Sequence, residues 1–274
     1  MERGLAINAP TGTDGSNRIA CQNAYITLSA SNTNTPTGVY TFAGATAAGG
    51  INQNLTFQDV VIMGALQGYN LNGTSAFPDN NVTITGTATL PATLTSYVIG
   101  QAGASAAAYG VSLANVTNLT VSNTVFSQIL SSGSTAYGIT STSGTGNTMT
   151  ISGNTFSNIG VTNNSVATGI NITSGASASI TGNSFSNLTN TGTNSSAALY
   201  GIFMSAGVGT ITGNSFSNFN KSGAASTGAY AAIRYSAVAS ATNTIARNTI
   251  TGLTTNTTAG IVSGIYLEGS TSAS

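Results

Sequence analysis

Short alternating segments of apolar and hydroxyl-bearing residues recur along the chain, and many of them end in glycine followed by asparagine. Residues 150–154 read Thr-Ile-Ser-Gly-Asn, and residues 179–183 read Ser-Ile-Thr-Gly-Asn. A period of two around a β-branched residue is typical of a strand that buries one face, and Gly-Asn is a turn signal. No 3.6-residue periodicity lies nearby. The pattern therefore predicts short strands joined by tight turns rather than helices.

The same unit returns at a nearly constant interval. The octapeptide ITGNSFSN occupies residues 180–187 and again residues 211–218. Related hexapeptides stand at 121–126, 151–156, 180–185, 211–216 and 245–250, so their last residues are 30, 29, 31 and 34 positions apart. A period of this length indicates a repeat architecture in which each unit buries its apolar face against its neighbours.

A second strand recurs in each unit, at residues 108–113, 136–141, 167–172, 199–204, 229–235 and 262–267. Weaker versions of the first strand stand at 54–57, 81–84 and 118–121, and residues 24–29 and 38–42 supply the coil before them. We therefore predict an all-β fold, a single-stranded parallel β-helix (β-solenoid) of about eight coils with roughly 30 residues each. Residues 25–274 form the β-helix in this interpretation, and residues 1–24 form an N-terminal arm or cap.

In stacked coils, residues that recur at the same position of each unit form files of side chains along the solenoid axis. The predicted inward-facing files are Val121, Ile151, Ile180, Ile211 and Ile245; Phe126, Phe156, Phe185, Phe216 and Ile250; and Ile129, Ile159, Leu188, Phe219 and Leu253. One turn position holds asparagine in four successive coils: Asn154, Asn183, Asn214 and Asn248. Amide side chains hydrogen-bond along such a stack and tolerate left-handed backbone, so a structural asparagine ladder is predicted there.

The unit I-[ST]-G-N-x-F-S-N resembles the repeat of the right-handed parallel β-helices of the pectate-lyase-like superfamily. It is similar in particular to the Ser/Thr/Asn-rich repeats of large bacterial cell-surface and secreted proteins. The resemblance covers residues 119–267 well and residues 24–118 weakly. It implies right-handed winding and an extracellular or cell-surface location. It leaves the activity open, because the superfamily includes lyases, hydrolases, phage tailspikes, adhesins and passive scaffolds.

The composition and charge of the chain exclude some classes of binding partner. Five Lys or Arg residues are balanced by five Asp or Glu residues, with no His, so the basic surface that nucleic acid requires is missing. No run of about 18 apolar residues exists to insert into a membrane. A net charge of zero gives little repulsion between copies and favours a homo-oligomer or homopolymer. Cys21 is the only cysteine, and neither a metal nor a cofactor is expected.

Candidate catalytic groups are few. Asp59 and Asp79 lie 20 residues apart, somewhat less than one coil, and are the one candidate acid pair. Arg234 and Arg247 are expected to meet Glu268 in an ion pair near the C-terminal coils. Lys221 stands in a Gly/Ser-rich loop and is expected to be solvated. Without His, the many serines have no customary general base, so no enzyme activity is expected.

Two outward arrays remain as alternatives to a purely structural role. One tyrosine precedes the core residue of the second strand in several coils, at Tyr109, Tyr137, Tyr200 and Tyr230. They form an external file for stacking sugars, or their rings cover a strand edge or pack within the stack. Hydroxyl pairs flank the isoleucine file, at Thr83/Thr85, Thr120/Ser122, Thr150/Ser152, Ser179/Thr181 and Thr210/Thr212. These pairs resemble the faces of ice-binding solenoids, although exposed strands also favour β-branched polar residues.

The predicted function is that of a non-enzymatic extracellular structural protein. In this hypothesis the β-helix is a subunit of a surface layer, filament or adhesin stalk and self-associates through its uncovered ends, because open strand edges recruit other chains. The alternatives are a carbohydrate-binding or polysaccharide-lyase-like module, with glycans as partners, and an ice-binding surface.

Overall fold

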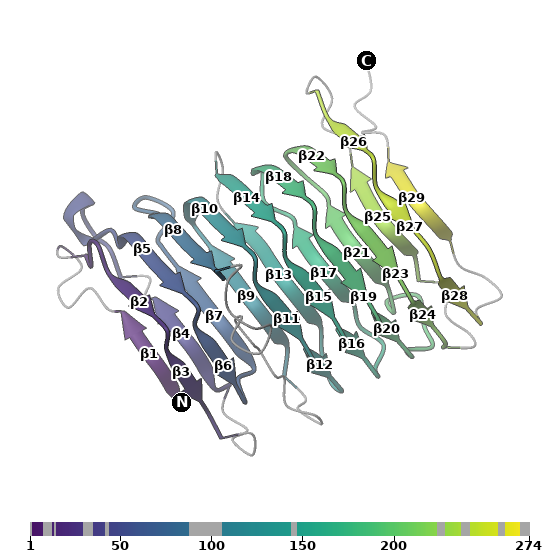
Figure 1. Ribbon diagram of the computed structural model, residues 1–274, viewed down its shortest axis with the longest axis horizontal. Helices are drawn as coiled ribbons and strands as arrows, with labels where there is room; N and C mark the ends of the chain where they lie inside the picture. Colours follow the sequence, from purple (N-terminus) through teal and green to yellow (C-terminus); the bar gives the residue numbers. More distant parts are fainter. Residues whose placement is uncertain are drawn as a thin grey trace.

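The chain winds into a parallel β-solenoid. The computed structural model describes residues 2–7, 13, 15–29, 35–41, 44–87, 106–143, 147–223, 228–236, 242–256 and 261–268. Equivalent strands of successive coils lie side by side, and the first and last described strands lie at opposite ends of the stack (Figure 1). The strands make about seven turns with a spacing of about 31 residues, which confirms the predicted fold class.

Four sheets of stacked parallel strands, with a short fifth, make up the walls. The nine-stranded sheet contains β1 (Arg3–Ile7), β4 (Thr37–Thr41), β7 (Gln67–Asn72), β9 (Ala108–Ala114), β13 (Ala136–Ser143), β17 (Ala167–Ile172), β21 (Leu199–Met204), β25 (Tyr230–Ser236) and β29 (Val262–Glu268). The eight-stranded sheet contains β2 (Ala20–Gln22), β5 (Gln53–Gln58), β8 (Asp79–Thr85), β10 (Val116–Ser122), β14 (Thr148–Ser152), β18 (Ser177–Thr181), β22 (Val208–Thr212) and β26 (Thr244–Ala246).

The smaller sheets follow these two along each coil. One five-stranded sheet contains β11 (Val125–Ser127), β15 (Thr155–Ser157), β19 (Ser184–Ser186), β23 (Ser215–Ser217) and β27 (Thr249–Ile250). The other contains β12 (Leu130–Ser131), β16 (Gly160–Val161), β20 (Thr189–Asn190), β24 (Phe219–Lys221) and β28 (Leu253–Thr255). In the N-terminal coils β3 (Tyr25–Thr27) pairs with β6 (Val61–Met63). The one helical element among the described residues is a short 3-10 turn, Ala48–Gly50.

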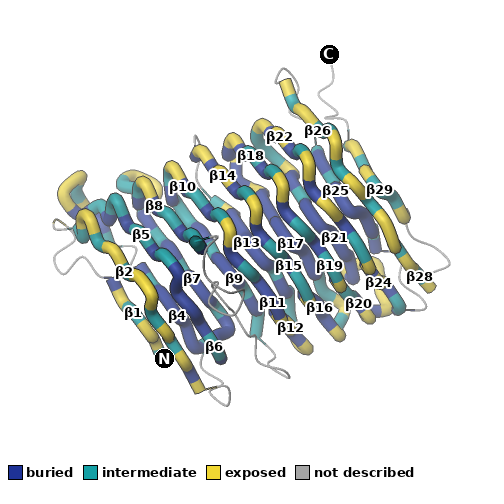
Figure 2. The backbone as a smooth tube through the Cα atoms, viewed as in Figure 1, coloured by how far each residue is buried: buried dark blue, intermediate teal, exposed yellow. Residues whose placement is uncertain are grey.

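The isoleucine file runs through the eight-stranded sheet in register. Val121 pairs with Ile151, Ile151 with Ile180, and the file continues through Ile211 to Ile245. Phe57 and Ile84 extend it toward the N-terminus. These side chains are buried except for Ile245 in the last coil, and Figure 2 shows where the buried residues lie along the backbone. Each coil thus buries a large apolar side chain against the coil above and below it.

The phenylalanine file runs through the first five-stranded sheet. The rings of Phe126, Phe156, Phe185 and Phe216 stack with centroid separations of 5.1, 4.7 and 4.8 Å, close to the spacing of paired strands. All four rings are almost completely inaccessible to solvent. Ile250 takes the next position and is only half-buried.

Glycine lines the nine-stranded sheet where these rings press against it. A Cβ placed on Gly138, Gly169 or Gly201 would lie 2.6 Å from the ring of the phenylalanine in the same coil, far closer than van der Waals contact allows. The one later coil that has alanine at this position, Ala232, has isoleucine instead of phenylalanine at Ile250. The recurring Tyr-Gly letters therefore mark the wall against which the phenylalanine rings pack.

The asparagine file forms a continuous ladder in the turn between the eight-stranded and the first five-stranded sheet. The Oδ1 atom of Asn183 accepts hydrogen bonds from the backbone N–H and the Nδ2 of Asn154, both at 2.9 Å. Nδ2 of Asn183 in turn donates to the carbonyl of Ile151 and to Oδ1 of Asn214. Asn248 continues the pattern at the C-terminal end. Each amide thus satisfies buried polar groups of two coils.

Residues 1–24, expected to form an arm or cap, contribute strands to both large sheets. β1 pairs in parallel with β4, and β2 pairs in parallel with β5. These strands form the first layer of the solenoid at its N-terminal end. Residues 1, 8–12 and 14 lie outside the described residues.

Candidate functional site

Two outward-facing files run along the nine-stranded sheet, three residues apart on each strand. The first passes through Tyr109, Tyr137, Thr168, Tyr200 and Ala231. The second passes through Ser112, Thr140, Asn171, Phe203, Arg234 and Tyr266. The parallel register places these varied residues on one face, where the loops that lead into the strands surround them.

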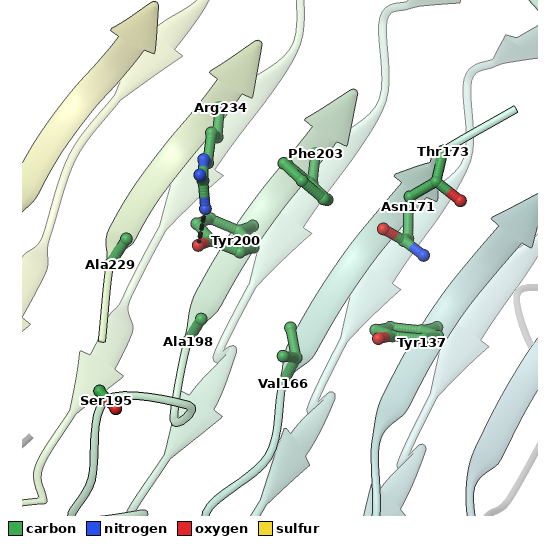
Figure 3. A pocket seen from close by; sticks show the side chains of 10 residues that line it. All are labelled: Tyr137, Val166, Asn171, Thr173, Ser195, Ala198, Tyr200, Phe203, Ala229 and Arg234. Carbon is green, nitrogen blue, oxygen red and sulfur yellow. Dashed lines mark hydrogen bonds between the residues drawn. The ribbon is translucent and has the colours of Figure 1, made fainter. Parts of the chain in front are cut away.

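A cavity of about 450 Å³ opens on this face above β17. It is lined by Tyr137, Val166, Asn171, Thr173, Ser195, Ala198, Tyr200, Phe203, Ala229 and Arg234, which Figure 3 shows from close by. The ring of Tyr137 borders one side, where it also stacks on Tyr109 with a centroid separation of 5.8 Å. The rings of Tyr200 and Phe203, 5.2 Å apart, border the other side. A volume of this size is within the usual range of small-ligand sites.

Arg234 organises the C-terminal side of this pocket. Its Nη1 donates to the hydroxyl of Tyr200, and its Nη2 lies 2.6 Å from Oε1 of Glu268. Its guanidinium carbon is 5.0 Å from the ring centre of Phe203, within cation–π range. A hydrogen bond from the Ser236 hydroxyl and the contact with Arg234 together outweigh burial and hold the pKa of Glu268 below its usual value. Glu268 is therefore ionised at neutral pH and neutralises the arginine.

This ion pair is the one expected between Arg234 and Glu268, but the expectation that Arg247 joins it is wrong. Arg247 follows Ala246 at the turn position that Gly153, Gly182 and Gly213 hold in earlier coils, and its φ of 54° is in the same left-handed region. Its side chain is exposed. The turn geometry directs it away from the face that carries Arg234.

The tyrosines of the pocket are neutral hydrogen-bonding groups. Burial, together with the neighbouring Tyr109, raises the pKa of Tyr137 to about 12. Burial also raises the pKa of Tyr200, although Arg234 opposes this shift. Both phenols therefore keep their protons at neutral pH, and neither supplies a negative charge to the pocket.

Of the two alternatives for the tyrosines, Tyr230 follows the second, because its ring packs within the stack and not in the outward file. Tyr230 pairs with Leu199, and Ala231 pairs with Tyr200. A shift of one residue turns a side chain to the other face of a strand, so Tyr230 points inward and is 1% exposed. Its hydroxyl donates to the carbonyl of Phe219 at 2.7 Å.

Comparison with protein-family models, with curated proteins and with solved structures finds no match for this chain. The functional interpretation of the site therefore rests on the geometry of its residues.

Asp59 and Asp79 do not form an acid pair. β5 and β8 pair with Gln53 opposite Asn80 and Gln58 opposite Thr85, so the two carboxyl groups stand at opposite ends of these strands. Their positions are seven residues apart along the strands, on the order of 20 Å. Asp79 accepts hydrogen bonds from the backbone and side chain of Asn52, and burial raises its pKa to about 6 despite these bonds and one from Thr41. Asp79 therefore binds the neighbouring coil, as the asparagines do elsewhere.

Lys221 is buried, which corrects the expectation of a solvated side chain. Its Nζ donates to the carbonyl of Ala197, and no part of the residue is accessible to solvent. Burial lowers the pKa of Lys221 from 10.5 to about 8. Because the unfolded chain then holds this proton more tightly than the folded one, the residue opposes folding below pH 8. The opposition fades as the pH rises from about 8 toward 10.5.

The hydroxyl pairs on the eight-stranded sheet form two regular outward files. One continues from Thr83 to Thr244, and the other from Thr85 to Ala246. The hydroxyls of Thr85 and Ser122 are 2.9 Å apart and hydrogen-bond to each other. The ice-binding alternative thus has a regular array, and a thermal-hysteresis measurement would test it.

Among the described residues, no helix is long and apolar enough to cross a bilayer. The same part of the chain brings no three His, Cys, Asp or Glu side chains together where they could hold a metal ion.

Proposed function

We propose that this chain is a non-enzymatic structural protein of the cell exterior, a β-solenoid subunit that associates end to end with copies of itself. A surface layer, a filament or an adhesin stalk is the kind of assembly that such a subunit builds. The repeat's resemblance to Ser/Thr/Asn-rich cell-surface proteins of the pectate-lyase-like superfamily supports the extracellular placement. The apolar surface of the last described coil is the observation that carries the self-association.

The last strand presents to solvent the same positions that earlier coils bury. Ile265 is 45% exposed and Leu267 is 63% exposed, whereas Ile233 and Tyr235, their partners on β25, are almost fully buried. Figure 2 shows exposed positions alternating along β29, at the end of the stack. Covering a leucine or isoleucine side chain contributes roughly 1.5–3 kcal/mol, so this edge gains substantially from a further layer.

The N-terminal end of the solenoid offers a matching layer. Leu5 and Ile7 on β1 begin the same two files that end at Ile265 and Leu267. The nine-stranded sheet has β1 at one edge and β29 at the other, and its strand pairs are parallel. A second copy placed in line would therefore continue the backbone hydrogen bonding and, through the partly exposed Leu5, the apolar file of Ile265 without a change of direction, whereas Ile7 is already buried.

Replacing Leu267 by lysine is expected to abolish the assembly. The 274-residue wild-type chain should sediment as elongated oligomers whose size grows with protein concentration, and Leu267→Lys should sediment as a monomer. The side chain is exposed, so the substitution should leave the fold unchanged while placing a charge in the contact.

Val208→Lys is the matched control for this experiment. Val208 is an exposed apolar residue on β22, on the side of the solenoid rather than at its end. The proposal predicts that this variant assembles like the wild type. A wild-type chain that stays monomeric over its soluble concentration range, or a Leu267→Lys chain that still assembles, would refute the end-to-end contact.

A further inference from the structure

The last described coil has open positions that match the repeat of the chain itself. Among the described residues, β26, β27 and β28 lie at the ends of their sheets and pair only with strands of the preceding coil. We infer that this edge binds, as one further parallel strand, an extended segment of a partner chain with the pattern Ile-x-x-Asn-x-Phe. Three features of the edge specify the three named positions of that segment.

The isoleucine file ends with a side chain that is incompletely covered. Ile245 is half-buried, whereas Ile211, its partner on β22, is fully buried. An apolar residue of a further strand would cover Ile245 as Ile245 covers Ile211. The backbone groups of an edge strand supply affinity for such a segment, and the alternating side chains supply specificity.

The asparagine ladder ends with open hydrogen-bonding groups. The backbone N–H and the Nδ2 of Asn214 both donate to Oδ1 of Asn248 at 3.0 Å. Among the described residues, nothing accepts from the backbone N–H of Asn248, and no asparagine donates to the carbonyl of Ile245 as Asn248 donates to that of Ile211. An asparagine of the segment would supply the missing acceptor and the missing donor at once.

Gly264 on β29 specifies the aromatic position. A Cβ on Gly201 would lie 2.6 Å from the ring of Phe216, whereas Ala232 in the next coil accompanies Ile250. β29 returns to glycine at this register position, yet a Cβ on Gly264 would meet only Ile250, at the ordinary contact distance of 3.4 Å. No described neighbour therefore requires this glycine. A phenylalanine of the bound segment, packed on Ile250 and against Gly264, would require it.

The inference goes beyond the end-to-end association and does not depend on it. That contact joins β29 to β1 of a second copy, and β29 lies one coil beyond β26. β2 of the second copy would therefore lie two strand spacings from β26, about 10 Å, which leaves room for one strand between them. The first coil of the second copy does not match the edge itself, because Cys21 continues the isoleucine file and is followed three residues later by Ala24 instead of asparagine.

Fluorescence anisotropy with a labelled synthetic peptide tests the inference on the full chain. The peptide has the sequence of residues 208–219, VGTITGNSFSNF, and one copy should bind per chain. Alanine in place of the peptide's Asn214 should weaken binding roughly tenfold, because Asn248 and Ile245 then lose their partners. Alanine in place of the peptide's Ser217, which is not one of the three specified positions, is the matched control and should leave binding unchanged.

The variant Gly264→Ala tests the aromatic position, and the described neighbours leave room for its methyl group. The wild type should bind the phenylalanine peptide more tightly than a peptide with isoleucine in place of Phe216. Gly264→Ala should bind the phenylalanine peptide roughly tenfold more weakly than the wild type does and should prefer the isoleucine peptide. Gly175→Ala is the matched control, because a Cβ on Gly175 meets no atom within 4 Å, and it should behave like the wild type.

Circular dichroism and thermal melting establish that each variant is folded. Leu5→Lys places a charge at the other end of the solenoid and should bind the peptide like the wild type, which separates peptide binding from the end-to-end association. The inference is overturned if the peptide does not bind, if the asparagine substitution leaves binding unchanged, or if the wild type does not prefer phenylalanine to isoleucine. A folded Gly264→Ala chain that binds both peptides as the wild type does would overturn it as well.

Discussion

Replacing Phe185 by alanine is expected to lower the free energy of unfolding by about 3–5 kcal/mol, the usual cost of removing a fully buried aromatic ring. The ring lies between those of Phe156 and Phe216 at 4.7 and 4.8 Å, so its loss leaves a cavity in the middle of the file. Urea denaturation followed by circular dichroism measures the change. Val208→Ala, on the solvent side of β22, should change stability by no more than about 0.5 kcal/mol.

Gly169 provides a second check on the same contact. A Cβ on this residue would lie 2.6 Å from the Phe185 ring, so Gly169→Ala alone should destabilise the fold by about 1–3 kcal/mol through overpacking. In the Phe185→Ala background the clash with the ring is removed, and only the carbonyl oxygen of Gly201, 2.7 Å from the added Cβ, still opposes the methyl group. The double variant should therefore be more stable than the sum of the single changes predicts, by about 0.5–3 kcal/mol. Strict additivity would show that the glycine and the ring do not touch.

Replacing Asn183 by alanine is expected to be comparably damaging, for a polar reason. The change removes the acceptor for two donors of Asn154 and the donor to the carbonyl of Ile151. Each buried group left unpaired costs about 1–3 kcal/mol, so the total loss should reach about 3 kcal/mol or more. The same denaturation experiment measures it.

Asn220 is the matched control for the asparagine ladder. It lies on β24 with its side chain exposed, and Asn220→Ala should leave stability within about 0.5 kcal/mol of the wild type. Equal losses for Asn183→Ala and Asn220→Ala would contradict a special role for the buried ladder.

The sequence predicts most of the fold because the fold repeats the same local environment. Ile180 and Ile211, or Phe185 and Phe216, stand in equivalent places in successive coils, so the same constraint selects the same letter. The sequence also contains a correlation between two positions of each coil: glycine at Gly201 goes with phenylalanine at Phe216, and alanine at Ala232 goes with isoleucine at Ile250. That relation became apparent only when the structure brought the two files together.

The candidate site was harder to predict because it depends on differences between coils. Asn171 and Phe203 occupy the same register position, yet their neighbours in the file are Thr140 and Arg234, so no repeated letter marks the pocket. The sequence signal that could have found the pocket is the residue three positions after that of Tyr200 in each second strand, because both positions face outward.

Two further differences between residues have local causes. In the sequence Tyr230 continues the series of tyrosines, but its coil is displaced by one residue and the ring turns inward. Lys221 stands in a Gly/Ser-rich stretch typical of loops, whereas β24 directs its side chain into the interior, where its Nζ donates a hydrogen bond to the carbonyl of Ala197. A single register shift or buried carbonyl has no counterpart in the periodic pattern.

The central claim is that each unit of about 30 residues lies directly on the preceding one, and pairs of engineered cysteines test it most directly. In a Cys21→Ala background, Ser186→Cys with Ser217→Cys places two thiols at paired positions of adjacent coils, where strands about 4.8 Å apart permit a disulfide. Ser157→Cys with Ser217→Cys places them two coils apart, beyond the reach of a bond. Mild oxidation, followed by mass spectrometry of the monomer, should give an internal disulfide in the first variant and free thiols in the second. A disulfide in the second variant, or none in the first, would contradict the stacked-coil account.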